Sequence, residues 1–518
     1  EAQAFVEPNI ETLLDVGVSV IPRDALIARL IGDIREWHAR HPDWRTTRAC
    51  IDERYGYHIY GGNCHIVPNH ALIILGLLYG EDNFQRSLMI TNTAGWDTDC
   101  NSGNVGCLMG IKNGLAGIDA GPDWRGPVAD RLYLPTADGG RAVTDAVQEA
   151  YRIVNIGRSL AGQAPATPKD GARFHFELPG SVQGFQPEAS GETCGTLTLE
   201  NVTGHSMRGK RSLALRYRHL APGRVARAAT ATFVPPEAVN MPGYGLLCSP
   251  TLYAGQTMRA AVAADAANPA PVTCRLYLRT YAPDDQLERT YGPDAQLKPG
   301  ESHTFEWHIG DTAGAPIAEA GVEISSVDER TPGHSGTVYL DYLTWDGVPD
   351  VVLRRPASGG RLWLRAWVAG VDQLTWSPDA TYRLVQNDGI GLAIQGTREW
   401  TDYTVIAPVR PHLARRAGIA ARVQGMRRYY ALLVCADGQA RLIKSLDGER
   451  MLAEVPCLWE LDHTYHLALT VQGTHLSATL DGAQLFEVED ADDPLTGGAI
   501  AMVVDEGRVE FGDVVVQL

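Results

Sequence analysis

The hydrophobic pattern of this chain changes its period once, near residue 160, and that change divides the fold into a helical part and a β-rich part. Before it, apolar side chains recur every three to four residues, as in "PRDALIARLIGDIREWHAR" (22–40). Such a stripe is typical of a helix that buries one face. From residue 172, apolar and polar residues alternate between Gly, Pro and Asp turns, as in "RSLALRYRHL" (211–220). That alternation is typical of strands.

The chain has 518 residues, which is too long for one hydrophobic core, so we expect a multidomain protein. An all-α bundle is expected over residues 1–160, followed by a linker over 161–171. Two antiparallel β-sandwich or jelly-roll domains are expected over 172–350 and 351–518. Asp-Gly pairs in "CADGQA" (435–440) and "TLDGAQ" (479–484) predict β-hairpins within the last domain.

The charge balance limits the partners. There are 62 acidic and 45 basic residues, a formal net charge of −17. This excess repels phosphate backbones and anionic lipid, so we expect no duplex nucleic acid and no membrane as partner. No apolar run approaches the roughly 20 residues that cross a bilayer. We expect a soluble protein of bacterial type, and the sequence favours neither a cytoplasmic nor an exported location.

Two carboxylates, Asp97 and Asp99, stand one residue apart in "NTAGWDTDCNSGNVGCLMG" (92–110). In an extended loop both would point the same way, and Asp99 would lie near the amino end of the next helix, where negative charge is favoured. Converging carboxylates repel each other unless a cation or proton lies between them. Oxygen ligands of this kind suit Mg²⁺, Mn²⁺ or Ca²⁺. The simpler alternative is that Asp97 is a turn residue and Asp99 a helix cap.

Residues 65–110, "HIVPNHALIILGLLYGEDNFQRSLMITNTAGWDTDCNSGNVGCLMG", resemble the carboxy-terminal part of the ADP-ribosylglycohydrolase family. That family has a Val-Pro stretch opening a buried helix, a second helix, and a Gly-x-Asp-Thr-Asp loop that enters a glycine-rich helix. The resemblance covers about residues 1–160. It implies an all-α bundle holding two Mg²⁺-type ions, with Asp97 and Asp99 as ligands. This chain has Cys100 where the family usually has a threonine ligand, and a neutral thiol is a poor Mg²⁺ ligand.

Further side chains around the loop are possible substrate-binding residues: Trp96, His65, Asn69, Tyr57, Asn92 and Asn101. Trp96 would either stack on a sugar or simply pack. Asn69 is most simply a helix cap, and Tyr57 is as well explained by loop packing. Asn92 and Asn101 would donate hydrogen bonds to the ligating carboxylates.

The resemblance also implies a missing half. The family's other ligands, a Thr-Asp-Asp cluster, lie in its amino-terminal half with a candidate acidic residue, and this chain contains no Thr-Asp-Asp. We therefore expect half of a metal site here, with the general acid or base outside this segment. The rest would come from a missing amino-terminal segment or a separate chain; otherwise the site is inactive. The helices expected at 1–21 and 24–38 are apolar on one face and need a partner surface.

The two β domains resemble known folds through strand order and turn residues. "FHFELPGSVQGF" (174–185) and "GTVYLDYLTWDG" (336–347) resemble galactose-binding-like sandwiches of the carbohydrate-binding type. "TYHLALTVQGTHLSATLDG" (464–482) resembles concanavalin/laminin-G-like jelly rolls. We expect both to bind or brace rather than to catalyse, and the acidic stretch "LFEVEDADD" (485–493) to be a solvated turn.

Three functions follow as hypotheses. The first is a metal-dependent glycoside hydrolase that cleaves a C1–O or C1–N bond of a sugar conjugate or oligosaccharide with a metal-positioned water. The second is an ADP-ribosyl hydrolase acting on protein or nucleotide. The third is a non-catalytic glycan-binding scaffold with a degenerate bundle.

Overall fold

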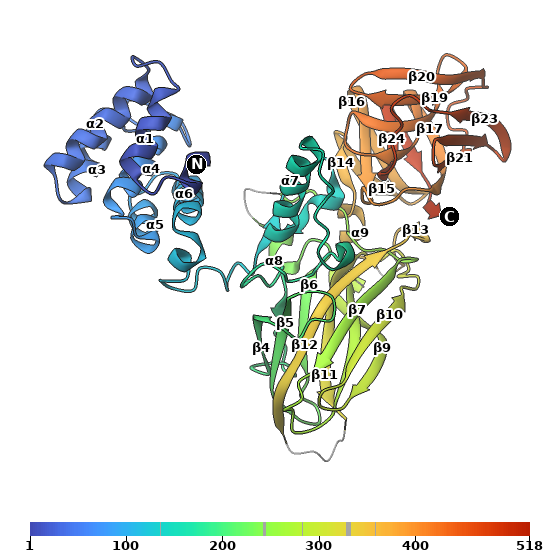
Figure 1. The fold of residues 1–518 in the computed structure, drawn as a ribbon. Helices are drawn as coiled ribbons and strands as arrows, with labels where there is room; N and C mark the ends of the chain where they lie inside the picture. The colour runs from blue at the N-terminus through green and yellow to red at the C-terminus, as the bar shows by residue number, and fades with distance from the viewer. Residues whose placement is uncertain (135, 242–244, 282, 328–332, 358) are drawn as a thin grey trace. The chain divides into compact units, whose positions relative to one another are not determined.

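The structure is a computed structural model that describes residues 1–134, 136–241, 245–281, 283–327, 333–357 and 359–518. It consists of two compact units, residues 1–128 and 129–518 (Figure 1). The first unit is helical and the second is dominated by antiparallel sheets, which confirms the predicted fold class.

The first unit is a small helical bundle around α4. Its elements are η1 (Ala2–Phe5), α1 (Ile10–Ser19), α2 (Leu26–Arg40), α3 (Trp44–Tyr55), α4 (Ile66–Tyr79), α5 (Phe84–Thr93) and α6 (Thr98–Ile118). The α4 helix contacts α1, α2, α3, α5 and α6. Its sequence is apolar almost all round, as a central helix requires, and most of its side chains are buried.

The apolar face of α2 is covered within this unit. Leu30, Ile31 and Ile34 are buried in the same core as α4, so the expected need of this helix for an outside surface is wrong. The apolar face of the first helix is covered only in part. Leu14 is buried, whereas Val16 is 41% exposed.

The second unit begins with a short hairpin and a helix. Its first elements are β1 (Arg131–Tyr133), η2 (Gly139–Arg141), β2 (Val143–Asp145), α7 (Ala146–Leu160) and η3 (Pro168–Gly171). Asp145 caps α7 by accepting hydrogen bonds from the backbone N–H groups of Val147 and Gln148, each at 2.9 Å. In the predicted linker, Lys169 is 6% exposed, so this segment is anchored in the β-sandwich at that point.

A β-sandwich follows, and its two five-stranded sheets enclose one core (Figure 1). One sheet has the order β10 (Ser302–His308), β7 (Thr257–Ala264), β12 (His334–Asp346), β5 (Arg211–Leu220) and β4 (Leu197–Thr203). The other has the order β3 (Gln186–Pro187), β6 (Ala226–Ala231), β11 (Ile317–Ser326), β8 (Val272–Tyr281) and β9 (Leu287–Leu297). Two short helical segments, α8 (Pro236–Val239) and η4 (Pro283–Asp285), lie in its loops.

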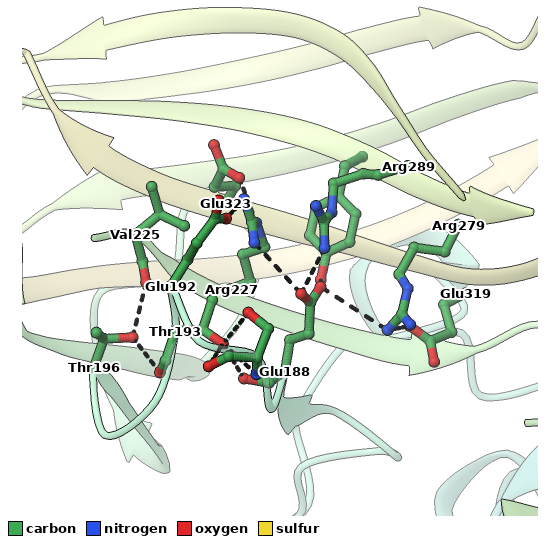
Figure 2. A network of polar contacts seen from close by, with 12 residues as sticks. Glu188, Glu192, Thr193, Thr196, Val225, Arg227, Arg279, Arg289, Glu319 and Glu323 are labelled. Carbon is green, nitrogen blue, oxygen red and sulfur yellow. Dashed lines mark hydrogen bonds and ion pairs between the residues drawn. The ribbon is translucent and has the colours of Figure 1, made fainter. Parts of the chain in front are cut away.

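The second of these sheets carries a network of ion pairs (Figure 2). Glu323 on β11 has a fully buried side chain, and it accepts hydrogen bonds from Arg227 and Arg275. Glu188 pairs with Arg289 at 2.5 Å and with Arg227 at 3.4 Å. Buried charges of this kind are tolerated only when they are paired, so the network fixes how β6, β8, β9 and β11 align.

The last part of the chain is a second sandwich whose sheets share long strands. Its elements are β13 (Val351–Leu353), α9 (Leu362–Arg365), β14 (Val368–Gly370), β15 (Gln373–Ser377), β16 (Ala380–Gln395), β17 (Tyr403–Val423), β18 (Arg428–Cys435), β19 (Gln439–Leu446), β20 (Glu449–Pro456), β21 (Tyr465–Gln472), β22 (His475–Leu480), β23 (Ala483–Glu489), β24 (Ala499–Phe511) and β25 (Val514–Gln517). The first part of β17 pairs with β21 and β25, and the last part pairs with β18, while β24 pairs with β17 from Val409 onward. One strand therefore serves both layers.

Both predicted hairpins are confirmed. β18 and β19 are joined through Asp437 and Gly438, and β22 and β23 are joined through Asp481 and Gly482. Asp481 and Gly482 have φ values of 48° and 81°, as a two-residue turn with both central residues left-handed requires.

The predicted solvated turn at 485–493 is wrong for residues 485–490, whereas residues 491–493 are exposed. Its first half lies in β23, and Asp490 is buried beside Lys444, with 2.7 Å between Oδ2 and Nζ. Tyr430 also donates to this carboxylate, at 2.5 Å.

Among the described residues, no helix has the length and apolarity needed to cross a membrane.

Candidate functional site

The loop that carries the two aspartates turns sharply before it enters α6. Gly95 and Trp96 have φ values of 90° and 60°, in the left-handed region. A tryptophan adopts this conformation only where its surroundings impose it. Asp97 then caps α6, with Oδ1 accepting from the backbone N–H of Cys100 at 3.5 Å. The loop is therefore held in one conformation, with Asp97 at the amino end of a helix.

Asn69 of α4 holds this loop in place. Its Oδ1 accepts hydrogen bonds from the backbone N–H of Asp97 at 3.2 Å and from the side chain of Asn101 at 3.1 Å. Its Nδ2 donates to the hydroxyl of Tyr57 at 2.7 Å and to the carbonyl of His65 at 3.0 Å. These four bonds use the full capacity of the amide. Asn69 is thus a positioning residue, and the structure brings it together with Tyr57, His65, Asp97 and Asn101.

His65 caps α4, since its Nδ1 accepts from the backbone N–H of Val67 at 3.2 Å. The side chain that caps α4 is therefore that of His65, and the prediction that Asn69 is the cap is wrong. The first turn of α4 and the amino end of α6 therefore meet at the Asn69 amide.

Trp96 packs against neighbouring side chains. The Arg48 guanidinium lies 3.9 Å from its ring centroid, and Tyr57 lies at a centroid distance of 5.2 Å. Arg48 in turn donates through Nε to the carbonyl of Ala94 at 2.8 Å. Arg48 thus covers one face of the indole, and packing accounts for the position of this ring.

Asp99 and Asn92 lie differently. Asp99 is exposed in the first turn of α6, where the helix dipole favours its charge. Asn92 is exposed on α5 and accepts a hydrogen bond from the Ser102 hydroxyl at 2.9 Å. That bond joins α5 to α6, so Asn92 is occupied in helix packing.

The thiols of Cys100 and Cys64 both contact the Asp97 carboxylate. Only Cys100 was identified from the sequence. Cys100 and Cys64 both donate hydrogen bonds to this carboxylate, which lowers the pKa of Asp97 and raises the pKa of each thiol. Both cysteines are exposed. Cys64 directly precedes the cap of α4, and that position, next to the helix that holds the aspartate loop, is the signal that could have identified it.

The donor set fits a hard divalent cation in part. Asp97 and Asp99 offer carboxylate oxygens, which Mg²⁺ and Mn²⁺ prefer, whereas the two thiols do not suit such an ion. Within the described part of the chain, no group of three or more His, Cys, Asp or Glu side chains is arranged to hold a metal. The carboxylates therefore fit as a portion of a metal site and need further ligands.

The first part of the chain matches a known protein family. Residues 1–154 match the family model of ADP-ribosylglycohydrolase, a hydrolase family, which confirms the resemblance. No curated protein matches the chain.

Solved structures match parts of the chain at low scores. The carbohydrate-binding module CBM66 from Bacillus subtilis is 16% identical, with a TM-score of 0.28, over 29% of this chain and 95% of that one. The xylan-binding domain CBM22-2 from Paenibacillus barcinonensis Xyn10C is 16% identical, with a TM-score of 0.25, over 34% and 97%. The galectin LEC-6 from Caenorhabditis elegans is 17% identical, with a TM-score of 0.19, over 23% and 84%. Scores this low support no conclusion about what the β-rich region binds.

Proposed function

We propose that this protein is a metal-dependent glycoside hydrolase of the ADP-ribosylglycohydrolase type, which cleaves a C1–O or C1–N glycosidic bond. One observation carries the proposal. The Gly-x-Asp-Thr-Asp loop, Gly95–Asp99, is held at the amino end of α6 by Asn69, which accepts hydrogen bonds from the N–H of Asp97 and from the side chain of Asn101, within the region that matches the family model.

In this proposal Asp97 and Asp99 hold the divalent cation, either Mg²⁺ or Mn²⁺. When bound, the metal would supply a Lewis acid that orients a water toward the anomeric carbon of the sugar. Asn69 keeps the backbone of Asp97 fixed, so that the carboxylate does not have to reorganise when the substrate arrives. Residues outside this bundle, on a further segment or a separate chain, complete the ligand set and provide the general acid or base.

ADP-ribose attached to a protein or nucleotide is a second candidate substrate, favoured by the family that residues 1–154 match. The same loop would serve it, since the bond cleaved is again at the anomeric carbon of a sugar with vicinal hydroxyls. Parallel assays with an ADP-ribosylated peptide and with neutral oligosaccharides would separate the two substrate classes.

The test is substitution of the two carboxylates. Asp97→Asn and Asp99→Asn should each weaken Mn²⁺ binding, measured by electron paramagnetic resonance, and abolish Mg²⁺-dependent cleavage. Glu53→Gln changes an exposed carboxylate on α3 and serves as the matched control. Full metal binding and full activity in both aspartate variants would refute the proposal.

A further inference from the structure

A large cleft lies within the second unit, to which the aspartate loop does not belong. It has a volume of about 640 Å³ and is lined by α7, by residues 166–173, by β12 and by Arg259 of β7. We call it the α7–β12 cleft. Its volume is in the range of roughly 300–1,000 Å³ that is typical of small-molecule sites.

The walls of the cleft are fixed by buried polar contacts. The pairing of β12 with β7 shifts between Leu340 and Tyr342, so that Asp341 forms a bulge. Lys169, whose side chain is fully buried, donates to the Asp341 carboxylate and to its carbonyl, each at 2.6 Å. Asn155 of α7 binds both the N–H and the carbonyl of Ala166, at 2.7 and 3.1 Å. These contacts join α7, residues 166–173 and β12, so the cleft is largely preformed.

The lining is rich in arginine although the chain as a whole is acidic. Arg152, Arg173, Arg208 and Arg259 all line the cleft. Their carboxylate partners that also line it have mostly exposed side chains: Asp170 (81%), Asp346 (66%) and Glu399 (51%). Ion pairs between exposed side chains contribute only about 0–1 kcal/mol, so an anionic ligand can replace the Arg208–Asp170 pair at little cost.

Arg173 lines the cleft and has a hydrogen-bond donor without a partner among the described residues. Its guanidinium lies 4.5 Å from the centroid of Trp345, and its side chain is only 11% exposed. Nη2 pairs with Glu399 at 2.5 Å, but Nε is buried without a hydrogen-bond partner among the described residues. A buried N–H of this kind is costly to leave unpaired, and an acceptor in the cleft would satisfy it. Burial lowers the pKa of Arg152, and the charge of Glu149, its ion-pair partner outside the cleft lining, opposes that shift.

We propose that the α7–β12 cleft binds a short acidic oligosaccharide, with a uronate carboxylate of the ligand on Arg173 and Arg152. A guanidinium presents paired N–H donors that match a carboxylate, and its bonds to an anion are stronger than those between neutral groups. The lining combines aromatic rings, such as that of Tyr151, with hydrogen-bonding side chains, such as Gln148. That mixture suits sugar rings, which have apolar faces and hydroxyl edges. This proposal does not depend on catalysis at Asp97.

The test is calorimetric titration of the full chain without added divalent metal, so that the aspartate site plays no part. Trigalacturonic acid should bind, and the neutral trisaccharide galactotriose should bind at least tenfold more weakly. Arg173→Gln and Arg152→Gln should each weaken binding of the acid at least tenfold. Arg216→Gln is the matched control, because it removes an equal charge from β5, where Arg216 pairs with Glu200 outside the cleft, and it should leave binding unchanged.

Glu399→Gln gives a prediction of the opposite sign. Because it frees Nη2 of Arg173, it should tighten binding of trigalacturonic acid, and it removes no group that supports the cleft wall. No binding of the acid, equal binding of the neutral trisaccharide, or an equal loss in Arg216→Gln would overturn the proposal. Inorganic phosphate that displaces the trisaccharide at an equal concentration would overturn the assignment of a sugar.

Discussion

Replacing Asn69 with alanine tests whether this residue holds the aspartate loop. The change removes four hydrogen bonds at a side chain that is 5% exposed, and it leaves the Asn101 amide, itself 1% exposed, without its acceptor. Hydrogen bonds contribute about 0.5–1.5 kcal/mol each, and a buried group left unpaired adds to the loss. We therefore expect local stability around residues 95–101 to fall by about 2–4 kcal/mol.

Amide hydrogen exchange measures this loss directly. A change of about 2–4 kcal/mol corresponds to an opening constant larger by a factor of roughly 30 to several hundred. The N–H of Asp97 reports the bond to Asn69 itself. Because the loop would no longer hold its carboxylate in place, Mn²⁺ affinity should also fall by about 10- to 100-fold.

Asn104→Ala is the control, since Asn104 lies on α6, the helix that Asp97 caps, is exposed, and bonds only to the carbonyl of Cys100. It should change exchange in the loop by less than about 0.5 kcal/mol. If Asn69→Ala left both the exchange of Asp97 and the Mn²⁺ affinity at their original values, the positioning role would be refuted.

Three further changes have defined outcomes. Glu323→Ala should destabilise β6 and β11 by about 3–5 kcal/mol, measured by amide exchange, because it leaves the buried Arg227 without its closest partner. Burial alone would raise the pKa of Glu510, but hydrogen bonds from Arg410, His412 and Arg383 outweigh it and lower that pKa to about 2. The pKa of Glu510 is thus lower in the folded than in the unfolded protein, so the stability from this carboxylate is present above about pH 4.5 and is lost as the pH falls toward about 2. Glu510→Gln should remove that acid dependence of the free energy of unfolding, measured by urea titrations. Cys100→Thr should raise Mg²⁺ affinity at the aspartate loop, measured by calorimetry, since a hydroxyl suits this ion better than a thiol.

Each of these has its own control. Glu192→Gln removes an exposed partner of the same Arg227 and should cost no more than about 1 kcal/mol; a loss equal to that of Glu323→Ala would contradict the role of burial. An unchanged acid transition in Glu510→Gln would show that other groups set it. Unchanged or weaker Mg²⁺ binding in Cys100→Thr would show that position 100 does not face the ion.

The sequence predicted the fold well where one local signal was sufficient. The period of the apolar pattern predicted a helical first part and identified α2, and Asp-Gly pairs located two hairpins. The predictions from sequence failed where contacts between residues distant in the chain determine the local structure. "FHFELPGSVQGF" alternates like a strand, yet the structure places Phe174, Phe176 and Phe185 as core side chains of an irregular segment. The acidic stretch at 485–493 was misread because Lys444, distant in sequence, pairs with Asp490.

The residues of the candidate site were likewise predicted where a local motif identified them and missed where the fold brings them together. The motif identified Asp97 and Asp99, and the helix start near residue 65 drew attention to His65 and Asn69. No spacing rule indicates that the Asn69 amide bonds to the backbone of Asp97, since 28 residues separate them. The role of Cys64 depends on how the amino ends of α4 and α6 meet, which only the folded bundle determines.

A crystal structure of the protein grown with Mn²⁺, with anomalous data collected at the manganese edge, tests the central claim most directly. The account predicts an anomalous peak within coordination distance of the Asp97 and Asp99 carboxylates, with the Asn69 hydrogen bonds intact. A map in which both carboxylates contact only protein donors, with manganese bound elsewhere or nowhere, would contradict it.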